Sequence, residues 1–196
     1  RHFGENRVEE LAEKLPELRD LPREEPPTWH MIGHVQSRKA RQVVETADIL
    51  HSVDSIRLAR RLDRFAGEAG RRLPVLLEMN VSGEEAKDGY VACEALGDAE
   101  AMERLVGELS ALAGLDNLEV KGLMTMAPIV ADPEQARPVF IRLRQLRDEL
   151  AAAFDQADWI QLSMGMTDDF EVAIEEGATV IRPGRAIFGP LTSRSE

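Results

Sequence analysis

The sequence has 196 residues, a formal net charge of −12 and 43% hydrophobic residues. This length and apolar fraction suit one domain, spanning residues 1–196, with a substantial core. The acidic balance disfavours nucleic-acid and anionic-membrane partners, because both require a basic face. No apolar run approaches a membrane span, no signal peptide is visible, and Cys93 is the only cysteine, so no intramolecular disulfide can form. We expect a cytoplasmic protein.

Strand-like and helix-like segments alternate along the chain. Short apolar runs predict seven strands, at Phe3–Asn6, Trp29–His34, Ile49–Asp54, Val75–Val81, Val120–Met126, Trp159–Met164 and Thr179–Arg182. Apolar residues at helical spacing form three stripes between them: Leu58, Leu62, Phe65 and Ala69; Met102, Leu105, Leu109 and Leu112; and Val139, Leu143, Leu146 and Leu150. The segment 168–171 resembles a capping box that opens a helix, and Gly177 would end that helix in a left-handed conformation.

This alternation predicts an α/β fold with a parallel sheet and helices outside it. Seven strands are one fewer than a closed (β/α)8 barrel requires, and the C-terminal end of the pattern looks complete. We therefore expect a TIM-type barrel that lacks its first strand in this chain. An open doubly wound sheet is the alternative.

Two glycine-containing segments, 162–166 and 182–185, each follow a strand-like run. In a barrel they would form consecutive loops at the mouth, where phosphate groups are often held. Ser163 offers a hydroxyl, and Arg182 and Arg185 offer guanidinium groups. Gly165 and Gly184 would let backbone N–H groups approach an oxyanion closely, although either glycine alone could serve only to form a tight turn.

Several motifs, in collinear order over the whole chain, resemble the pyridoxal-phosphate homeostasis proteins. These motifs are 3–6, 29–36, 52–54, 80–85, 122–128, 162–166 with 168–170, and 182–189. The resemblance implies a barrel like that of alanine racemases, which binds pyridoxal 5′-phosphate for intracellular cofactor balance without an established turnover reaction. It also implies a monomer for the intact family fold and apo-enzymes as possible acceptors of the cofactor.

The resemblance also assigns residues to the cofactor. The matching motifs imply that five residues surround the phosphate: Ser163, Met164, Gly165, Gly184 and Arg185. They also imply that Arg182 lies near the pyridine ring or the phosphate, and that Asn6 lines the pocket. A guanidinium that faces the ring nitrogen would disfavour a pyridinium, which suits a cofactor holder better than carbanion chemistry. An ordinary surface or ion-pair arginine is the alternative for Arg182.

Two departures from the family pattern stand out. The lysine to which the family attaches the cofactor lies upstream of the Phe-Gly-Glu-Asn motif, on a strand absent here. None of Lys14, Lys39, Lys87 and Lys121 matches it. We therefore expect an N-terminally incomplete chain without the covalent attachment point. Arg185 stands where many relatives carry a small hydroxyl residue.

Other readings remain open. A racemase-type enzyme would require a second domain with a catalytic tyrosine, whereas the only tyrosine here is Tyr90. A phosphate-binding metabolic barrel unrelated to the cofactor would use a carboxylate such as Glu78 or Asp54.

We expect no metal site. His30 and His34 would lie about 13 Å apart along one strand, too far for one ion. His2 and His51 have no evident partners in the sequence.

Overall fold

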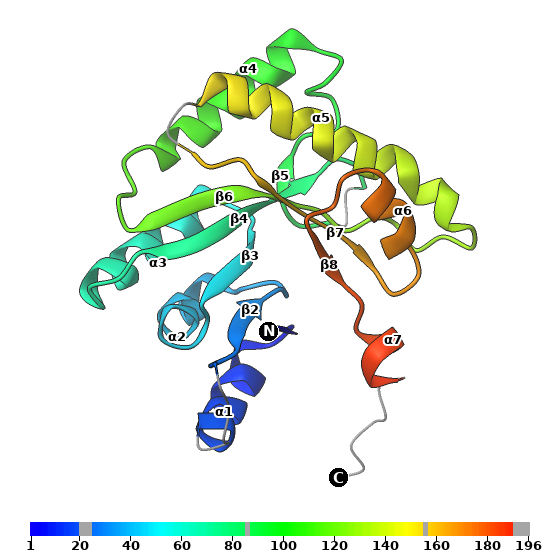
Figure 1. Cartoon of the computed structure of the whole chain (residues 1–196). Coiled ribbons are helices and arrows are strands. Elements are labelled where there is room, and N and C mark those ends of the chain that lie inside the picture. Colours follow the sequence, from blue (N-terminus) through cyan, green and yellow to red (C-terminus); the bar gives the residue numbers. More distant parts are fainter. Residues whose placement is uncertain (20–24, 85–86, 155–156, 190–196) are drawn as a thin grey trace.

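The computed structural model describes residues 1–19, 25–84, 87–154 and 157–189, and its core is a curved, seven-stranded parallel sheet (Figure 1). The strands are β1 (His2–Glu5), β2 (Thr28–Met31), β3 (Ile49–Val53), β4 (Leu73–Asn80), β6 (Leu118–Met124), β7 (Gln161–Met166) and β8 (Val180–Arg182). Each pairs in parallel with the next strand in this order. A two-residue strand, β5 (Tyr90–Val91), pairs with β4 and was not predicted.

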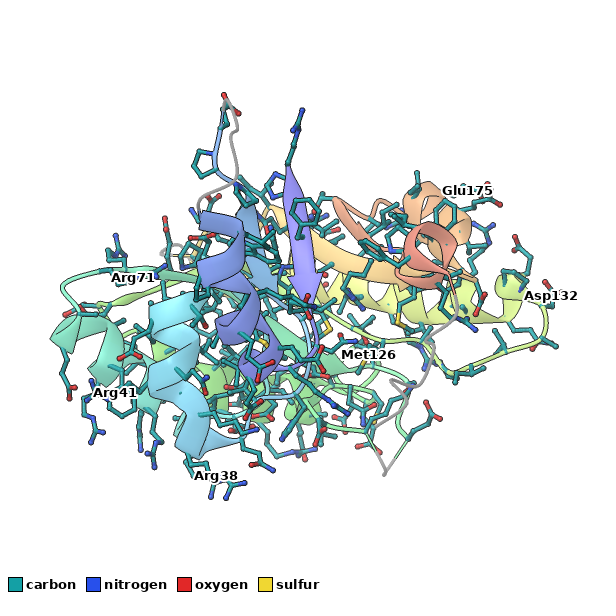
Figure 2. The ribbon with its side chains drawn as sticks, turned by 90° about the horizontal axis from the view of Figure 1, so that it is seen from below. Arg38, Arg41, Arg71, Met126, Asp132 and Glu175 are labelled. Carbon is teal, nitrogen blue, oxygen red and sulfur yellow. The ribbon has the colours of Figure 1, made fainter. Side chains whose placement is uncertain are left out.

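Helices connect the strands and lie outside the sheet (Figure 1). They are α1 (Val8–Arg19), α2 (Ala40–Thr46), α3 (Ile56–Glu68), α4 (Ala99–Leu109), α5 (Arg137–Ala153), α6 (Phe170–Glu175) and α7 (Arg185–Phe188). Three 3-10 turns, η1 (Ser37–Lys39), η2 (Ser110–Leu112) and η3 (Pro133–Ala136), adjoin α2, α4 and α5. Figure 2 shows Met126, just beyond the end of β6, between the side of α1 and α2 and the side of α5 and α6.

The strand order confirms the predicted barrel and shows that the doubly wound alternative is wrong. Successive strands are neighbours throughout the path, whereas a doubly wound sheet reverses its order at a switch point. The path begins at β1 and ends at β8, so the sheet is one strand short of the eight of a closed barrel. The predicted strand at 29–34 ends earlier than expected, at Met31.

The helical stripes bury the sheet's outer face. In α5, Val139, Leu143, Leu146 and Leu150 are all buried, as their spacing predicts. In α3 the stripe holds as far as Phe65, but Ala69 is the exposed C-cap residue and lies outside the core.

The predicted capping box at the start of α6 does not form. Asp169 is the N-cap residue, but its side chain caps no N–H of α6. Its Oδ1 instead accepts a hydrogen bond of 2.6 Å from the backbone N–H of Met166, which ties β7 to the helix. Gly177 does end the helix as predicted, with a φ of +93°.

No helix in the described ranges is long and apolar enough to cross a membrane.

Gly122 in β6 should be irreplaceable. Its φ is +149°, and a Cβ there would lie 1.9 Å from the carbonyl oxygen of Gln161 on β7. We expect Gly122→Ala to lower the free energy of unfolding by more than about 2 kcal/mol in urea denaturation.

The matched control is Gly107→Ala in α4, where a Cβ would meet nothing within 4 Å. This substitution should stabilise the helix by up to about 1 kcal/mol. Equal effects of the two substitutions would contradict the close approach of β6 and β7.

Candidate functional site

A hydrogen-bonded chain of polar side chains crosses the inside of the barrel. Nδ1 of His51 on β3 lies 2.9 Å from Oγ of Ser163 on β7, although these strands are not neighbours in the sheet. This contact therefore spans the interior. Both residues are fully buried, with 0% of their surface exposed.

The chain continues to the first strand. Nε2 of His51 lies 2.7 Å from Nδ1 of His30 on β2, and Nε2 of His30 lies 2.8 Å from Nδ1 of His2 on β1. The expectation that His2 and His51 lack partners is therefore wrong. These partners lie 28 and 21 residues from His30 in the sequence, so only the pairing of parallel strands brings them together.

Arg182 on β8 is the last residue of this hydrogen-bonded row, at the end opposite His2. Its NH1 donates to Oγ of Ser163 at 2.5 Å, and its NH2 donates to the backbone oxygen of Thr125 at 2.9 Å. Burial lowers the pKa of Arg182 to about 10, while Glu78 and Asp169 act to raise it. The guanidinium is therefore still charged at neutral pH, and it is held by β7 and by the end of β6.

Arg182 determines which group donates and which accepts in each hydrogen bond of this row. A guanidinium can only donate, so Oγ of Ser163 accepts from Arg182 and its single proton is best used toward Nδ1 of His51. His51 then donates from Nε2 to His30, and His30 donates from Nε2 to His2. This arrangement satisfies each ring nitrogen that takes part in the chain.

The inner histidines are neutral. Burial, reinforced by the neighbouring His2, lowers the pKa of His30 to about 4. Burial, with His30 and Arg182 nearby, lowers the pKa of His51 well below its ordinary value. The interior therefore carries one fixed positive charge, on Arg182, beside neutral imidazoles.

Glu78 on β4 is a buried carboxyl that the sequence did not assign to this site. It is 4% exposed, and its Oε2 has no hydrogen-bond partner among the described residues. Burial raises the pKa of Glu78 to about 7, and Asp54 and Asp88 act in the same direction. Arg182 opposes them, so Glu78 lies within electrostatic reach of both the arginine and the two aspartates.

The loops after β7 and β8 meet at the outer edge of the barrel. Arg185 forms an ion pair with Asp168, and the backbone N–H of Ala186 donates to Oγ1 of Thr167 at 3.3 Å. Arg185 and Asp168 are 61% and 66% exposed. Thr167 is a polar group of this rim that the sequence analysis missed, although it directly follows the motif at 162–166.

The structure divides the predicted cofactor residues into two sets. Ser163 and Arg182 lie inside the barrel, bonded to each other, whereas Gly184 and Arg185 are exposed on the rim. A Cβ at Gly184 would meet nothing within 4 Å, so open space adjoins it.

Of the other three predicted residues, two have structural roles and one is exposed. The side chain of Met164 is fully buried in the hydrophobic core. Gly165 has a φ of +90°, and a Cβ there would lie 2.6 Å from that of Ala173 on α6, so close approach to the helix requires this glycine. Asn6 is exposed just after β1, with its backbone against Gly33.

All four lysines of the sequence are ion-paired. Lys14 contacts Glu5 at 2.5 Å, Lys39 pairs with Glu9, Lys87 pairs with Glu84, and Lys121 contacts Glu119 at 2.6 Å. Lys87 also donates to the backbone oxygen of Met126 at 3.1 Å, which holds it at the edge of the mouth. Glu85, the last residue of the motif at 80–85, lies outside the described residues.

The raised pKa of Glu78 predicts that this residue destabilises the folded state increasingly as the pH rises. Between about 4.5, the ordinary pKa, and about 7, the folded state holds a proton that the unfolded state has lost. The free energy of unfolding therefore falls as pH rises through this window. We expect Glu78→Gln to gain about 1–3 kcal/mol relative to the parent chain between pH 4.5 and pH 7.5, measured by urea denaturation.

Glu103→Gln, at an exposed position of α4, is the control and should shift stability by the same small amount at every pH. Parallel stability curves for Glu78→Gln and the parent chain would show that folding does not raise the pKa of Glu78.

Comparisons with known proteins agree with this architecture. The profile of the alanine racemase N-terminal domain matches residues 1–192. The pyridoxal phosphate homeostasis protein of Aquifex aeolicus is 41% identical over 187 residues, which cover 95% of this chain and 75% of that protein. The human protein of the same name is 36% identical over 195 residues, covering 96% of this chain and 68% of that protein.

Solved structures give the same result. PipY of Synechococcus elongatus PCC7942 superposes with a TM-score of 0.85 without PLP and 0.82 with PLP bound, at 41% and 40% identity. In both cases the match covers 96% of this chain and 82% of PipY. Alanine racemase of Clostridium difficile 630 shares the fold, with a TM-score of 0.70 at 14% identity over 98% of this chain and 45% of the racemase. The chain thus belongs to the pyridoxal phosphate homeostasis protein family, whose barrel is that of the alanine racemase N-terminal domain.

Proposed function

We propose that this chain binds pyridoxal 5′-phosphate at the β7–β8 side of the barrel mouth and acts as a non-catalytic protein of intracellular cofactor homeostasis. The observation that carries the proposal is the meeting of two neighbouring loops around two arginines, one inside the barrel and one on its rim. The names of the relatives and the PLP-bound form of PipY support the identity of the ligand.

The residues present fit a phosphate ester of an aromatic aldehyde. The doubly charged phosphate suits the rim, where Gly184 leaves open space and the guanidinium of Arg185 can leave Asp168 for a stronger anion. The ring suits the interior side, toward Arg182. Two of the five N–H groups of Arg182 are used within the protein, and the others remain for a ring nitrogen or a phosphate oxygen. Asn6 would contribute to the pocket wall from the end of β1.

The assignment of individual contacts follows from this division. Ser163 acts by holding Arg182 from inside, and Met164 and Gly165 act through the backbone that their close packing fixes. Gly184 and Arg185 are the residues of the set that can meet the phosphate directly.

The charge on Arg182 argues for a holder of the cofactor. When bound, pyridoxal phosphate supplies an aldehyde and an electron-withdrawing ring, whose withdrawing power depends on protonation of the ring nitrogen. A fixed guanidinium beside that nitrogen repels a second positive charge and keeps the ring unprotonated. Arg182 therefore supports binding without strong carbanion chemistry.

The racemase-type alternative lacks a suitable tyrosine in this sequence. Tyr90 is 2% exposed, and its hydroxyl has no hydrogen-bond partner within the described part of the chain. Burial raises the pKa of Tyr90 above its ordinary value, so this hydroxyl is a poor proton carrier.

Membership of the family supports a wider role. We infer that the chain forms one cofactor-binding domain, acts in the cytoplasm and passes the cofactor to apo-enzymes, and that the intact fold works as a monomer. The single cysteine, which allows no intramolecular disulfide, supports the inference about the cytoplasm.

The phosphate contact can be tested with two ligands that differ only in the phosphate. In equilibrium titrations followed by absorbance, we expect pyridoxal to bind at least about tenfold more weakly than pyridoxal phosphate. Arg185→Ala should weaken binding of pyridoxal phosphate about three- to tenfold and leave binding of pyridoxal unchanged.

Arg60→Ala removes the same charge from an exposed position of α3 and should leave both affinities within about twofold. Equal affinity for the two ligands would mean that no phosphate subsite exists. An equal loss of affinity for pyridoxal phosphate in Arg185→Ala and Arg60→Ala would mean that only the net charge of the protein matters, and not a contact with Arg185.

The ion-paired lysines predict how the cofactor is held. After borohydride reduction of the complex and peptide mass spectrometry, we expect no stoichiometric adduct on Lys14, Lys39, Lys87 or Lys121, because each ammonium is engaged by a carboxylate. A full-occupancy adduct on any one of them would identify a covalent site and refute this expectation.

A further inference from the structure

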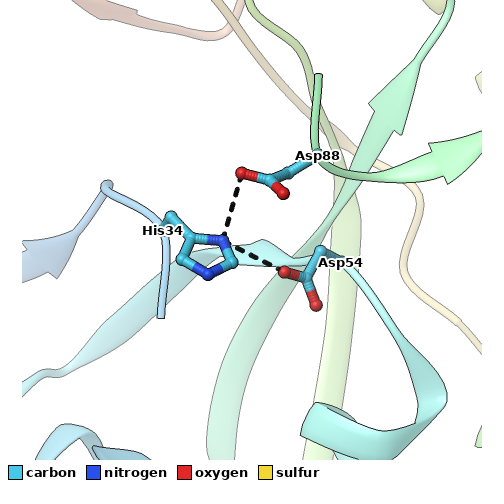
Figure 3. A group of neighbouring side chains, drawn as sticks. All are labelled: His34, Asp54 and Asp88. Carbon is cyan, nitrogen blue, oxygen red and sulfur yellow. Dashed lines mark ion pairs between the residues drawn. The ribbon is translucent and has the colours of Figure 1, made fainter. Parts of the chain in front are cut away.

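An imidazole and two carboxylates converge at the opposite side of the barrel mouth. His34 follows β2, Asp54 directly follows β3, and Asp88 shortly precedes β5. Nδ1 of His34 lies 3.3 Å from Oδ2 of Asp54 and 3.3 Å from Oδ2 of Asp88 (Figure 3). The three atoms all lie within 4.8 Å of one another.

One hydrogen bond accounts for only one of these two contacts. A ring nitrogen carries at most one proton, so Nδ1 of His34 can be fully bonded to only one of the two carboxylates. Asp54 is oriented independently, because its Oδ1 accepts a hydrogen bond of 2.8 Å from the hydroxyl of Ser55. This bond leaves Oδ2 of Asp54 facing His34.

The two aspartates have no permanently charged partner among the described residues. Within the described ranges, Asp54 and Asp88 have ion pairs only with His34, and no lysine or arginine reaches them. Asp54 is 14% exposed, so water screens it only in part.

Glu78 is an independent indication that a cation belongs here. This carboxyl is almost completely buried, its Oε2 is unpartnered among the described residues, and both aspartates raise its pKa. The backbone places it next to both aspartates, because its neighbour Leu77 pairs with Val53, and a Cβ at Gly89 would lie 2.8 Å from the carbonyl oxygen of Glu78. A buried acid without a hydrogen-bond partner near two further acids is costly, and a cation bound here would add to the stabilisation that Arg182 provides.

We propose that His34, Asp54 and Asp88 bind one divalent transition-metal cation, with Zn²⁺ favoured over Mn²⁺, and that water fills the remaining coordination positions. Ligand atoms about 2.1 Å from one ion are separated by about 3.0–3.4 Å, and both His34 contacts fall in this range. Asp88 is 59% exposed and can turn to complete the set. One imidazole and two carboxylates suit Zn²⁺ or Mn²⁺, whereas Mg²⁺ prefers oxygen ligands alone.

This site differs from the prediction made from the sequence. The spacing of His30 and His34 along one strand excludes a shared ion only if both lie on that strand. Because β2 ends at Met31, His34 lies in the following loop and turns toward carboxylates from two other segments. The site also stands apart from the proposed cofactor contacts on the β7–β8 side, so it does not rest on the proposed function.

The test is a metal titration of the untagged full chain after removal of bound ions with a chelator. By calorimetry we expect one Zn²⁺ per chain, weaker binding of Mn²⁺, and binding of Mg²⁺ at least about tenfold weaker than Mn²⁺. Electron paramagnetic resonance of Mn²⁺ gives a second readout that does not depend on activity or on the cofactor.

Three variants test the ligands: His34→Ala, Asp54→Asn and Asp88→Asn. Each should weaken Zn²⁺ binding at least about tenfold, while Glu103→Gln on α4 removes one charge and should leave it within about twofold. His34 and Asp88 are 48% and 59% exposed, so their variants should fold normally, which circular dichroism checks. Absence of a stoichiometric Zn²⁺ site in the parent chain, or unchanged affinity in the folded His34 and Asp88 variants, would overturn the proposal.

Discussion

The hydroxyl of Ser163 is the contact on which the interior of this barrel depends. It accepts from Arg182 at 2.5 Å and lies 2.9 Å from His51, so it joins β8 to β3 across the inside of the sheet. His30 and His2 extend this connection to β1. Because the arginine can only donate, it fixes which atom donates in every hydrogen bond that follows. All the hydrogen bonds from Ser163 to His2 therefore donate in the same direction, away from Arg182.

This network separates two electrostatic regions at the barrel mouth. On the β7–β8 side, Arg182 and Arg185 supply positive charge, with neutral imidazoles behind the first of them. On the β2–β5 side, Asp54, Asp88 and Glu78 supply acidic groups. Among the described residues the two aspartates have ion pairs only with His34, and Arg182 acts on Glu78 alone of the three. An anion and a cation could therefore be bound at one mouth without competing for the same groups, even though the chain as a whole has a net charge of −12.

The same division supports the proposal that a barrel of the alanine racemase type serves here as a cofactor holder. The fold provides the rim loops, and the residues placed in them determine the chemistry. In the proposed binding mode an always-charged arginine would face the ring. The one tyrosine is buried in β5 beside β4, and the four lysines are paired with carboxylates. Under the proposed function, each of these features would favour retention of the cofactor over its use in turnover.

The sequence by itself determined the seven strands, their alternation with helices and the pair of glycine-containing loops, because these depend on local apolar periodicity and on turn residues. It also pointed to the neighbourhood of Ser163 and Arg182, since consecutive β/α units place their loops side by side. Only the tertiary structure decided that Ser163 faces inward beside Arg182 and that His2, His30 and His51 form one chain. It alone brought His34, Asp54 and Asp88 together. These contacts join residues from separate strands and loops, and they depend on barrel curvature, strand register and the point at which β2 ends, none of which a local sequence pattern encodes.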